Sequence, residues 1–487
     1  MTPSRPVPVT LTSRVPSRRR LLCAAVAALM IGQVQAADLL TITRDALDNN
    51  SELASERSTT SSAEEGINVE QADLNPQVTA SGEAAYNHIF ETQSQSGFSG
   101  TGSDDDYLSY GLNLQATQKL YDALNSREVN VAEAQLEQQT YTLAATEQQV
   151  LIDTSSAYFD ILRAYEILEA RRAQERAIGR QLEQAQEQFD VGLIAITEVE
   201  EARATFDQSR ADRIVAESDL QVAFEALERL TGKRYDSIEM LQDDLPIALP
   251  EPSSRDAWIE LAIERNPELL AQQAGVDVAR ERIDVARAAD LPVVEAFANY
   301  AYSDDERDNF EDYNSNSQVG VSASMPLYTG GRTSASVRQT TYDLESSQYD
   351  FESQRRETVL QVRSLYTQVS NDVSTVAARK QSIVSNQSAL DATRAGYEVG
   401  TRNIVDVLNA EQNLYNAIAD YADARFNYVI NLLSLHRQAG VLDAQDIAEL
   451  NAFLVEEGQV NFTLPEQGEA DEYDAVLDIG APPSQDG

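Results

Sequence analysis

The sequence predicts an α+β protein made of two similar halves, each with a pair of long β-strands and a long coiled-coil helical hairpin. Three observations support this fold class. A segment recurs at a constant spacing, four segments alternate apolar and polar residues as strands do, and heptad columns run through the longest proline-free stretches. At 1.5 Å per residue, the longest helices are expected to form rods of about 100 Å.

The repeat is clearest in two short stretches. "FDVGLIAITEVEEA" covers residues 189–202, and "YEVGTRNIVDVLNA" covers residues 397–410, a spacing of 208 residues. The alignment extends without a gap from Leu151–Gly232 to Val359–Gly440. A tandem duplication explains this, and its unit of about 200 residues is too long for a solenoid repeat.

The strands are predicted from period-two alternation. Residues 108–120 place leucines on one face and polar residues on the other, and residues 319–327 repeat the pattern. The segments that follow Pro76 and Pro292 alternate less cleanly. Strands this long suit a tilted membrane crossing, but an ordinary half-buried sheet explains the alternation equally well.

Polar loops connect the two strands of each pair. "ETQSQSGFSGTGSDDD" (91–106) and "SDDERDNFEDYNSNS" (303–317) carry no apolar pattern and read as long solvent loops. Four strands cannot close a membrane barrel, and open sheet edges are not tolerated in lipid. If the strands cross a membrane, several chains must therefore share one barrel.

The helical rods are predicted from sustained heptads. Leu136, Leu143, Val150 and Ala157 form one column, and Val362, Val369 and Val376 form its counterpart in the second half. In each half a shorter helix of about 35 residues (39–73 and 256–289) is expected to stack end to end with the second arm of the hairpin. A glycine, Gly192 or Gly400, ends each long helix at the hairpin turn.

These elements divide the chain into four parts. Residues 1–36 are a predicted signal peptide, with five arginines, no acid and a 12-residue apolar run. The first half is 37–250, with strands at about 76–90 and 107–121 and a helical hairpin at about 123–232. The second is 251–455, with strands at about 292–303 and 317–328 and a hairpin at about 331–440. Residues 456–487 are acidic, rich in Pro and Gly, and expected to be disordered.

Composition argues against several functions. The chain has 80 acidic and 37 basic residues and a net charge of −43, so no nucleic-acid partner is expected. The only cysteine, Cys23, lies in the signal peptide, and the two histidines, His88 and His436, are far apart. No catalytic triad, zinc spacing or phosphate-binding loop is present. We therefore expect no enzyme activity, no metal site and no cofactor.

The turn motifs carry a resemblance. "VGLIAITEVEEARATFD" (191–207) and "VGTRNIVDVLNAEQNLYNAIADYADARFNYVINLLSLHRQAG" (399–440) resemble the TolC family of outer-membrane efflux and secretion channels. The likeness covers residues 38–455. It implies a homotrimer in which three chains form a shared twelve-strand β-barrel in the outer membrane and an α-helical tunnel through the periplasm. It also implies docking to a periplasmic adaptor (membrane fusion) protein and an inner-membrane pump.

The resemblance also implies roles for tip residues. Tyr397 and Arg402 would hold one hairpin to Thr197 and Glu198 of the other, and Gln181 matches a further position of this lock. Glu198 stands where the family pattern has an aspartate. Asp406 would line the pore constriction, and Asn409 replaces a second family aspartate on nearly the same helical face. Adaptor contacts would fall on the two turns, at Val191, Gly192, Leu193, Val399, Gly400 and Thr401.

The expected function is therefore an outer-membrane channel-tunnel that exports substrates from an efflux pump or a type I secretion system by iris-like opening of the tips. A soluble periplasmic coiled-coil adaptor or scaffold is the alternative, because it too would have a signal peptide and long hairpins. The four long strands favour the channel. The exported substrate does not follow from the sequence.

Overall fold

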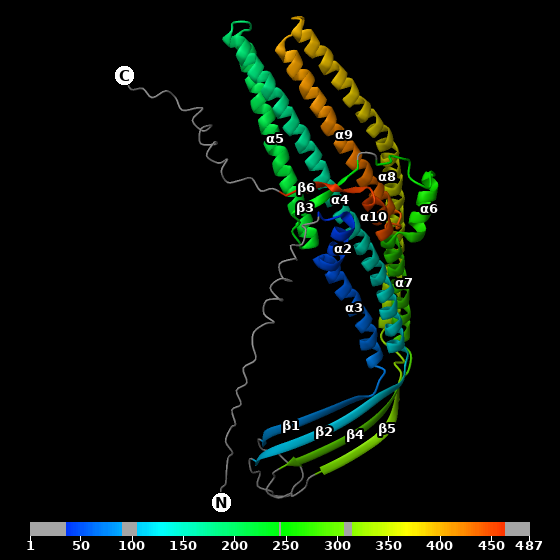
Figure 1. Ribbon diagram of the computed structural model, residues 1–487. Coiled ribbons are helices and arrows are strands. Elements are labelled where there is room, and N and C mark those ends of the chain that lie inside the picture. The colour runs from blue at the N-terminus through cyan, green and yellow to red at the C-terminus, as the bar shows by residue number, and fades with distance from the viewer. Residues whose placement is uncertain (1–35, 90–104, 243–244, 306–313, 463–487) are drawn as a thin grey trace, which may run out of the picture.

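The computed structural model describes residues 36–89, 105–242, 245–305 and 314–462. The molecule is elongated, with a curved sheet at one end, long helices that run away from it, and a band of short elements around the middle (Figure 1). Residues 1–35 of the predicted signal peptide and the segment from 463 onward lie outside the described residues. None of the described helices combines the length and the apolar character needed to cross a membrane.

The sheet at one end has four antiparallel strands in the order β1-β2-β4-β5. They are β1 (Gln77–Ile89), β2 (Asp105–Asp122), β4 (Val293–Asp305) and β5 (Asn314–Ser324). The two hairpins meet where β2 pairs with β4. Among the described residues, β1 and β5 each have a strand neighbour on one side only, so the sheet is open at both edges.

One face of this sheet is apolar and exposed. Leu112 is 62% exposed, and Val319 is 84% exposed, so these side chains have no protein to cover them within one chain. The opposite face is polar, because side chains alternate along each strand. A single sheet with an exposed apolar face is what a wall facing lipid requires.

The fourth strand differs from its predicted bounds. It was expected at about 317–328 but runs from Asn314 to Ser324, so Met325 and Leu327 lie beyond it. Pro326 follows directly after Met325, and proline cannot donate a hydrogen bond to a ladder. The alternation of apolar residues thus continues past the point where pairing stops.

The two longest helices are α4 (Ala123–Asp190) and α8 (Arg332–Glu398), with 68 and 67 residues. They give rods of about 100 Å at 1.5 Å per residue, as predicted. Helix α4 pairs with α5 (Ile196–Thr231) toward the tip and with α3 (Ser51–Ala72) toward the sheet. Helix α8 pairs in the same way with α9 (Ile404–Gln438) and α7 (Pro267–Ala288).

The shorter helix of each half is broken where one helix was predicted. In the first half, α2 (Leu39–Asn49) ends and α3 begins at Asn50, whose side chain accepts hydrogen bonds from the backbone N–H groups of Glu52 and Leu53. In the second half, α6 (Arg255–Arg265) and α7 meet at Asn266, which caps Leu269 at 2.9 Å. An asparagine side chain favours such a restart because it replaces the missing backbone acceptor.

The middle band joins the two halves. Strands β3 (Ser237–Leu241) and β6 (Leu454–Asn461) pair antiparallel beside α10 (Ala444–Asn451). Tyr158 of α4 donates to the backbone oxygen of Glu239 at 2.6 Å, and the fully buried Trp258 of α6 donates to the oxygen of Pro252 at 2.7 Å. The largest apolar core of the described residues lies here, so the band holds the rods at mid-height.

The segment from 456 was expected to be disordered, and this is wrong for its beginning. Residues 456–461 belong to β6, and Phe462 packs edge-on against Phe224 of α5 with 5.3 Å between ring centres. Strand pairing and this aromatic contact outweigh an acidic composition. Residues 463–487 of the predicted tail lie outside the described part.

Candidate functional site at the helical tips

Both hairpins turn on a glycine in the left-handed conformation. Gly192 and Gly400 each have φ of +76°, which only glycine adopts without steric cost. Leu193 N–H donates to the oxygen of Gln188, and Thr401 N–H donates to the oxygen of Gly396, both at 2.8 Å. The two tips therefore have the same backbone turn, and their difference lies in the side chains.

The restart after each turn differs between the tips. At the second tip, Asn403 accepts from Asp406 N–H at 2.8 Å, and the Asp406 carboxylate accepts from Asn403 N–H at 3.4 Å, which forms a capping box. At the first tip, α5 begins after Ala195 with no side-chain cap. Thr197 lies inside the first turn of α5 and stays exposed, so its hydroxyl is not used as a cap.

The proposed adaptor contacts form an exposed apolar end on each hairpin. Val191 is 71%, Leu193 74% and Val399 74% exposed. A Cβ added at Gly192 or Gly400 would meet no atom within 4 Å. Apolar side chains gathered at the far end of a rod, with open space around the turn, are typical of a contact surface for another protein.

Tyr397 links the second tip to the first. Its hydroxyl donates to Gln188 Oε1 of α4 at 2.8 Å. Burial raises the pKa of this phenol, and the negative charge of the nearby Glu198 adds to the rise, although the hydrogen bond to Gln188 opposes it. Within one chain, the hydrogen-bond partner of Tyr397 is thus Gln188 of the first hairpin, a residue that the sequence analysis missed, and the expected hold of Tyr397 on Thr197 and Glu198 stays a prediction.

Arg402 and Asp406 lie on the same hairpin and contact each other. Arg402 Nη1 is 3.8 Å from Asp406 Oδ2, with the two side chains 60% and 38% exposed. This loose contact is the ion pair of Arg402 within one chain, and its expected pairing with Thr197 and Glu198 stays a prediction. Asn409 lies one turn further along α9 and is exposed.

The remaining predicted lock residue, Gln181, leads to a buried carboxylate. Gln181 of α4 donates to Glu411 Oε1 at 3.3 Å, and Arg394 of α8 binds the same oxygen at 2.7 Å. The Glu411 side chain is fully buried. These three residues tie α4, α8 and α9 together one layer below the turns. Sequence reasoning missed Glu411, although its position between Leu408 and Leu414 in an apolar heptad seam was a visible signal.

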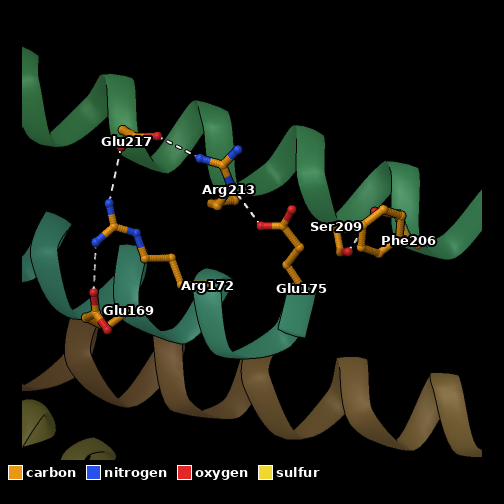
Figure 2. A network of polar contacts seen from close by, with 7 residues as sticks. All are labelled: Glu169, Arg172, Glu175, Phe206, Ser209, Arg213 and Glu217. Atoms are coloured by element: carbon orange, nitrogen blue, oxygen red, sulfur yellow. Dashed lines mark hydrogen bonds and ion pairs between the residues drawn. The ribbon is translucent and has the colours of Figure 1, made fainter. Parts of the chain in front are cut away.

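A second polar cluster connects α4 and α5, the two helices of the first hairpin (Figure 2). Arg213 of α5 binds Glu175 of α4 and Glu217 of α5, both at 2.7 Å. Arg172 of α4 bridges Glu169 at 3.0 Å and Glu217 at 3.2 Å. We call these five residues the arginine–glutamate network.

The second hairpin lacks this network at the corresponding positions. At the repeat spacing, Arg172, Glu175 and Arg213 correspond to Lys380, Ile383 and Tyr421. Glu217 corresponds to Arg425, which is 3% exposed and binds Glu166 of α4 at 2.8 Å. The first hairpin is thus tied within itself, whereas this polar contact of the second hairpin reaches across to the first.

The fold defines a class of protein: an elongated chain with an open four-stranded sheet that has an exposed apolar face, and long helical hairpins that run away from it, as in outer-membrane channels. Comparison with known proteins gives the same class. The chain matches the Outer membrane efflux protein family over residues 42–233 and 258–441, and it belongs to that family.

Individual relatives agree with this assignment. The chain is 34% identical to the outer membrane protein TolC of Vibrio cholerae, over 86% of this chain and 94% of the relative. It is 33% identical to TolC of Escherichia coli K12, over 92% and 91%. It is 32% identical to the alkaline protease secretion protein AprF of Pseudomonas aeruginosa, over 71% and 72%.

Solved structures share the fold. The CmeC outer membrane channel of Campylobacter jejuni superposes with a TM-score of 0.70 at 16% identity, over 93% of this chain and 98% of that one. VceC of Vibrio cholerae gives 0.69 at 19% identity, over 82% and 96%. The protein is therefore an outer-membrane channel for efflux or type I secretion. The rival interpretation, a soluble periplasmic adaptor or scaffold, is wrong.

Proposed function

We propose that three chains assemble into one export channel, in which three copies of the four-stranded sheet close a twelve-strand barrel and the rods enclose a periplasmic tunnel. The observation that best supports this assembly is that the sheet of one chain is open at both edges and has an exposed apolar face. Strands β1 and β5 have unpaired outer edges among the described residues, and unpaired edges in lipid cost several kcal/mol per backbone group. Pairing β5 of one chain with β1 of the next removes every edge.

The rods support assembly independently. Val215 and Val222 lie seven residues apart on α5 and are 60% and 64% exposed, and Tyr342 and Tyr349 repeat this on α8 at 68% each. Apolar residues at heptad spacing are the seam of a coiled coil. Each hairpin therefore carries exposed apolar residues at coiled-coil spacing that helices of another chain can cover.

Charge complements these seams. A groove of about 640 Å³ between α4 and α5 has a mostly apolar lining that includes four aspartates, among them Asp160 and Asp219, and two arginines, Arg163 and Arg229. Helix α8 carries exposed arginines at comparable height, among them Arg363 and Arg379. An acidic groove that meets a basic helix of the next chain sets the register of the ring and disfavours contacts between like hairpins.

We infer that the tips close the tunnel through contacts between chains as well as within them. Arg402 is held only loosely by Asp406, and Thr197 is exposed, so Arg402 and Thr197 are both available for contacts with a neighbouring chain. In the predicted lock, Glu198 is the carboxylate that Arg402 would bind. One Asp406 per chain would form the pore constriction. The arginine–glutamate network ties the two helices of the first hairpin together. We therefore propose that the second hairpin is the one that moves when the tunnel opens.

The exposed tip residues Val191, Gly192 and Leu193, and their counterparts Val399, Gly400 and Thr401, are proposed to dock a periplasmic adaptor protein that belongs to an inner-membrane pump. Each chain presents two such ends, so a ring of three presents six.

A disulfide experiment tests assembly and lock together. The chain has a single cysteine in its predicted signal peptide, so Glu198→Cys with Arg402→Cys should cross-link chains under oxidation into a covalent trimer on denaturing gels. The matched control is Glu198→Cys with Lys380→Cys, because Lys380 is exposed on the same hairpin as Arg402 but far below the tip. A protein that stays monomeric in detergent would contradict the proposal.

A further inference from the structure

The polar face of the sheet carries one large apolar side chain in its central rows. Across β2, β4 and β5, the register places Gln115 beside Asn299 and Asn299 beside Gln318 in one row. The neighbouring row toward the helices contains Thr117, Phe297 and Gly320. Under the proposed assembly this face lines the barrel lumen. The Phe297 ring then lies next to the row of uncharged carboxamide side chains formed by Gln115, Asn299 and Gln318.

The Phe297 ring lies directly over Gly320. A Cβ built on Gly320 would be 2.8 Å from Phe297 Cζ and 3.1 Å from Cε1. Contacts below 3.0 Å do not occur between such carbon atoms, because the attractive well lies at about 3.5–4.0 Å. The absence of a side chain at position 320 is therefore what allows the ring to lie against the sheet.

We propose that Gly320 seats Phe297 flat on the barrel wall, so that this ring sets the bore of the lumen and is the aromatic surface that a passing solute contacts. The inference rests on the proposed trimeric barrel, in which three such rings lie at one height. The ring face presented to the lumen suits apolar groups and organic cations, which aromatic faces attract.

A purely structural role is the competing explanation. An aromatic residue opposite a glycine covers the gap in a strand pair and stabilises the sheet. In that case, substitution of either residue would lower stability and leave the conductance of correctly assembled channels unchanged. The two explanations differ in the conductance of Gly320→Ala, which the proposal lowers and a purely structural role leaves unchanged.

Single-channel recording in planar bilayers separates them. Gly320→Ala should force the ring off the wall and lower the conductance, and adding Phe297→Ala should restore it to the wild-type level or above. Gly111→Ala is the matched control, since Gly111 lies on the same face and its added Cβ would lie 3.9 Å from the nearest atom, Glu83 Cβ. Equal conductance in Gly320→Ala and the wild type would overturn the proposal.

A cysteine test checks the position of the ring without relying on its size. Phe297→Cys should react with a charged, membrane-impermeant thiosulfonate, and the current should fall in up to three steps, whereas Ala298→Cys on the lipid face should stay unmodified. No change in current at Phe297→Cys, with an active channel, would refute the lumenal position. A wild-type protein that forms no channel would instead refute the proposed assembly.

Discussion

Removal of Arg394 should destabilise the tips more than neutralisation of its partner Glu411. Arg394 is 40% exposed, but Glu411 is fully buried and its Oε2 has no hydrogen-bond partner in the described part of the chain. Arg394→Ala leaves a buried carboxylate without its cation, which typically costs 3–5 kcal/mol when both partners are buried. Because Arg394 is partly solvated, we expect about 2 kcal/mol.

Glu411→Gln should cost far less. The amide is isosteric, keeps a contact with Gln181 and removes a buried charge that is only partly satisfied, while Arg394 can turn to water. We expect a loss of about 0.5 kcal/mol or less, since exchanging a partly satisfied buried ion for a neutral group is often nearly neutral. In the double variant, most of the cost of Arg394→Ala should disappear.

The assay is thermal unfolding of the detergent-solubilised protein, followed by the helical circular dichroism signal, for the two single variants and the double variant. Arg379→Ala is the control, because Arg379 makes a comparable 2.8 Å ion pair with Asp420 between α8 and α9, with both partners about half exposed. Equal losses for Arg394→Ala and Glu411→Gln would refute the reasoning, because they would show that the charge is not effectively buried.

Three further predictions concern the tips and the rods. Tyr397→Phe removes the hydrogen bond to Gln188, worth about 1 kcal/mol, and should raise the closed-state conductance in bilayers; an unchanged conductance would count against the lock. Asn409→Asp adds one carboxylate per chain beside Asp406 and should tighten block by a trivalent cation about tenfold, since three added charges about 10 Å away attract it by a few kcal/mol before screening. Burial raises the pKa of Asp160 despite the opposing charge of Arg163, so its protonation favours the folded state, and this contribution is lost as the pH rises through the folded pKa. Asp160→Asn should therefore unfold with a weaker pH dependence as the pH rises above the ordinary aspartate pKa of 3.8, and an unchanged profile from thermal unfolding would contradict this.

Much of the fold was predictable because its signals are long. Columns such as Leu136, Leu143 and Val150 repeat over many turns, and two-residue alternation persists for a dozen residues, so chance matches are rare. The boundaries were less predictable. The break at Asn50 depends on a side-chain cap, and the pairing of β6 with β3 joins residues more than 200 positions apart, which no local pattern records.

The tip site was predictable in its location but not in its contacts. The glycine turns and the positions of Tyr397 and Arg402 were expected, since they lie within the motif. The partner of Tyr397, Gln188, and the partner of Gln181, Glu411, were not, because both contacts arise from the packing of one hairpin against the other. A polar residue in an apolar seam, as at Glu411, is the one sequence feature that indicates such a contact before the structure is known.

The free edges of β1 and β5 also bear on how the channel is made. If three chains share one barrel, as proposed, a solitary chain cannot complete its own sheet, and the final folding step should be of higher than first order in protein concentration. In cells that synthesise the chain slowly, each subunit would remain unassembled for longer, with the backbone N–H and C=O groups along its two edge strands unpaired. Quality control by chaperones and proteases would then act on single subunits waiting for neighbours, and hardly at all on the finished ring.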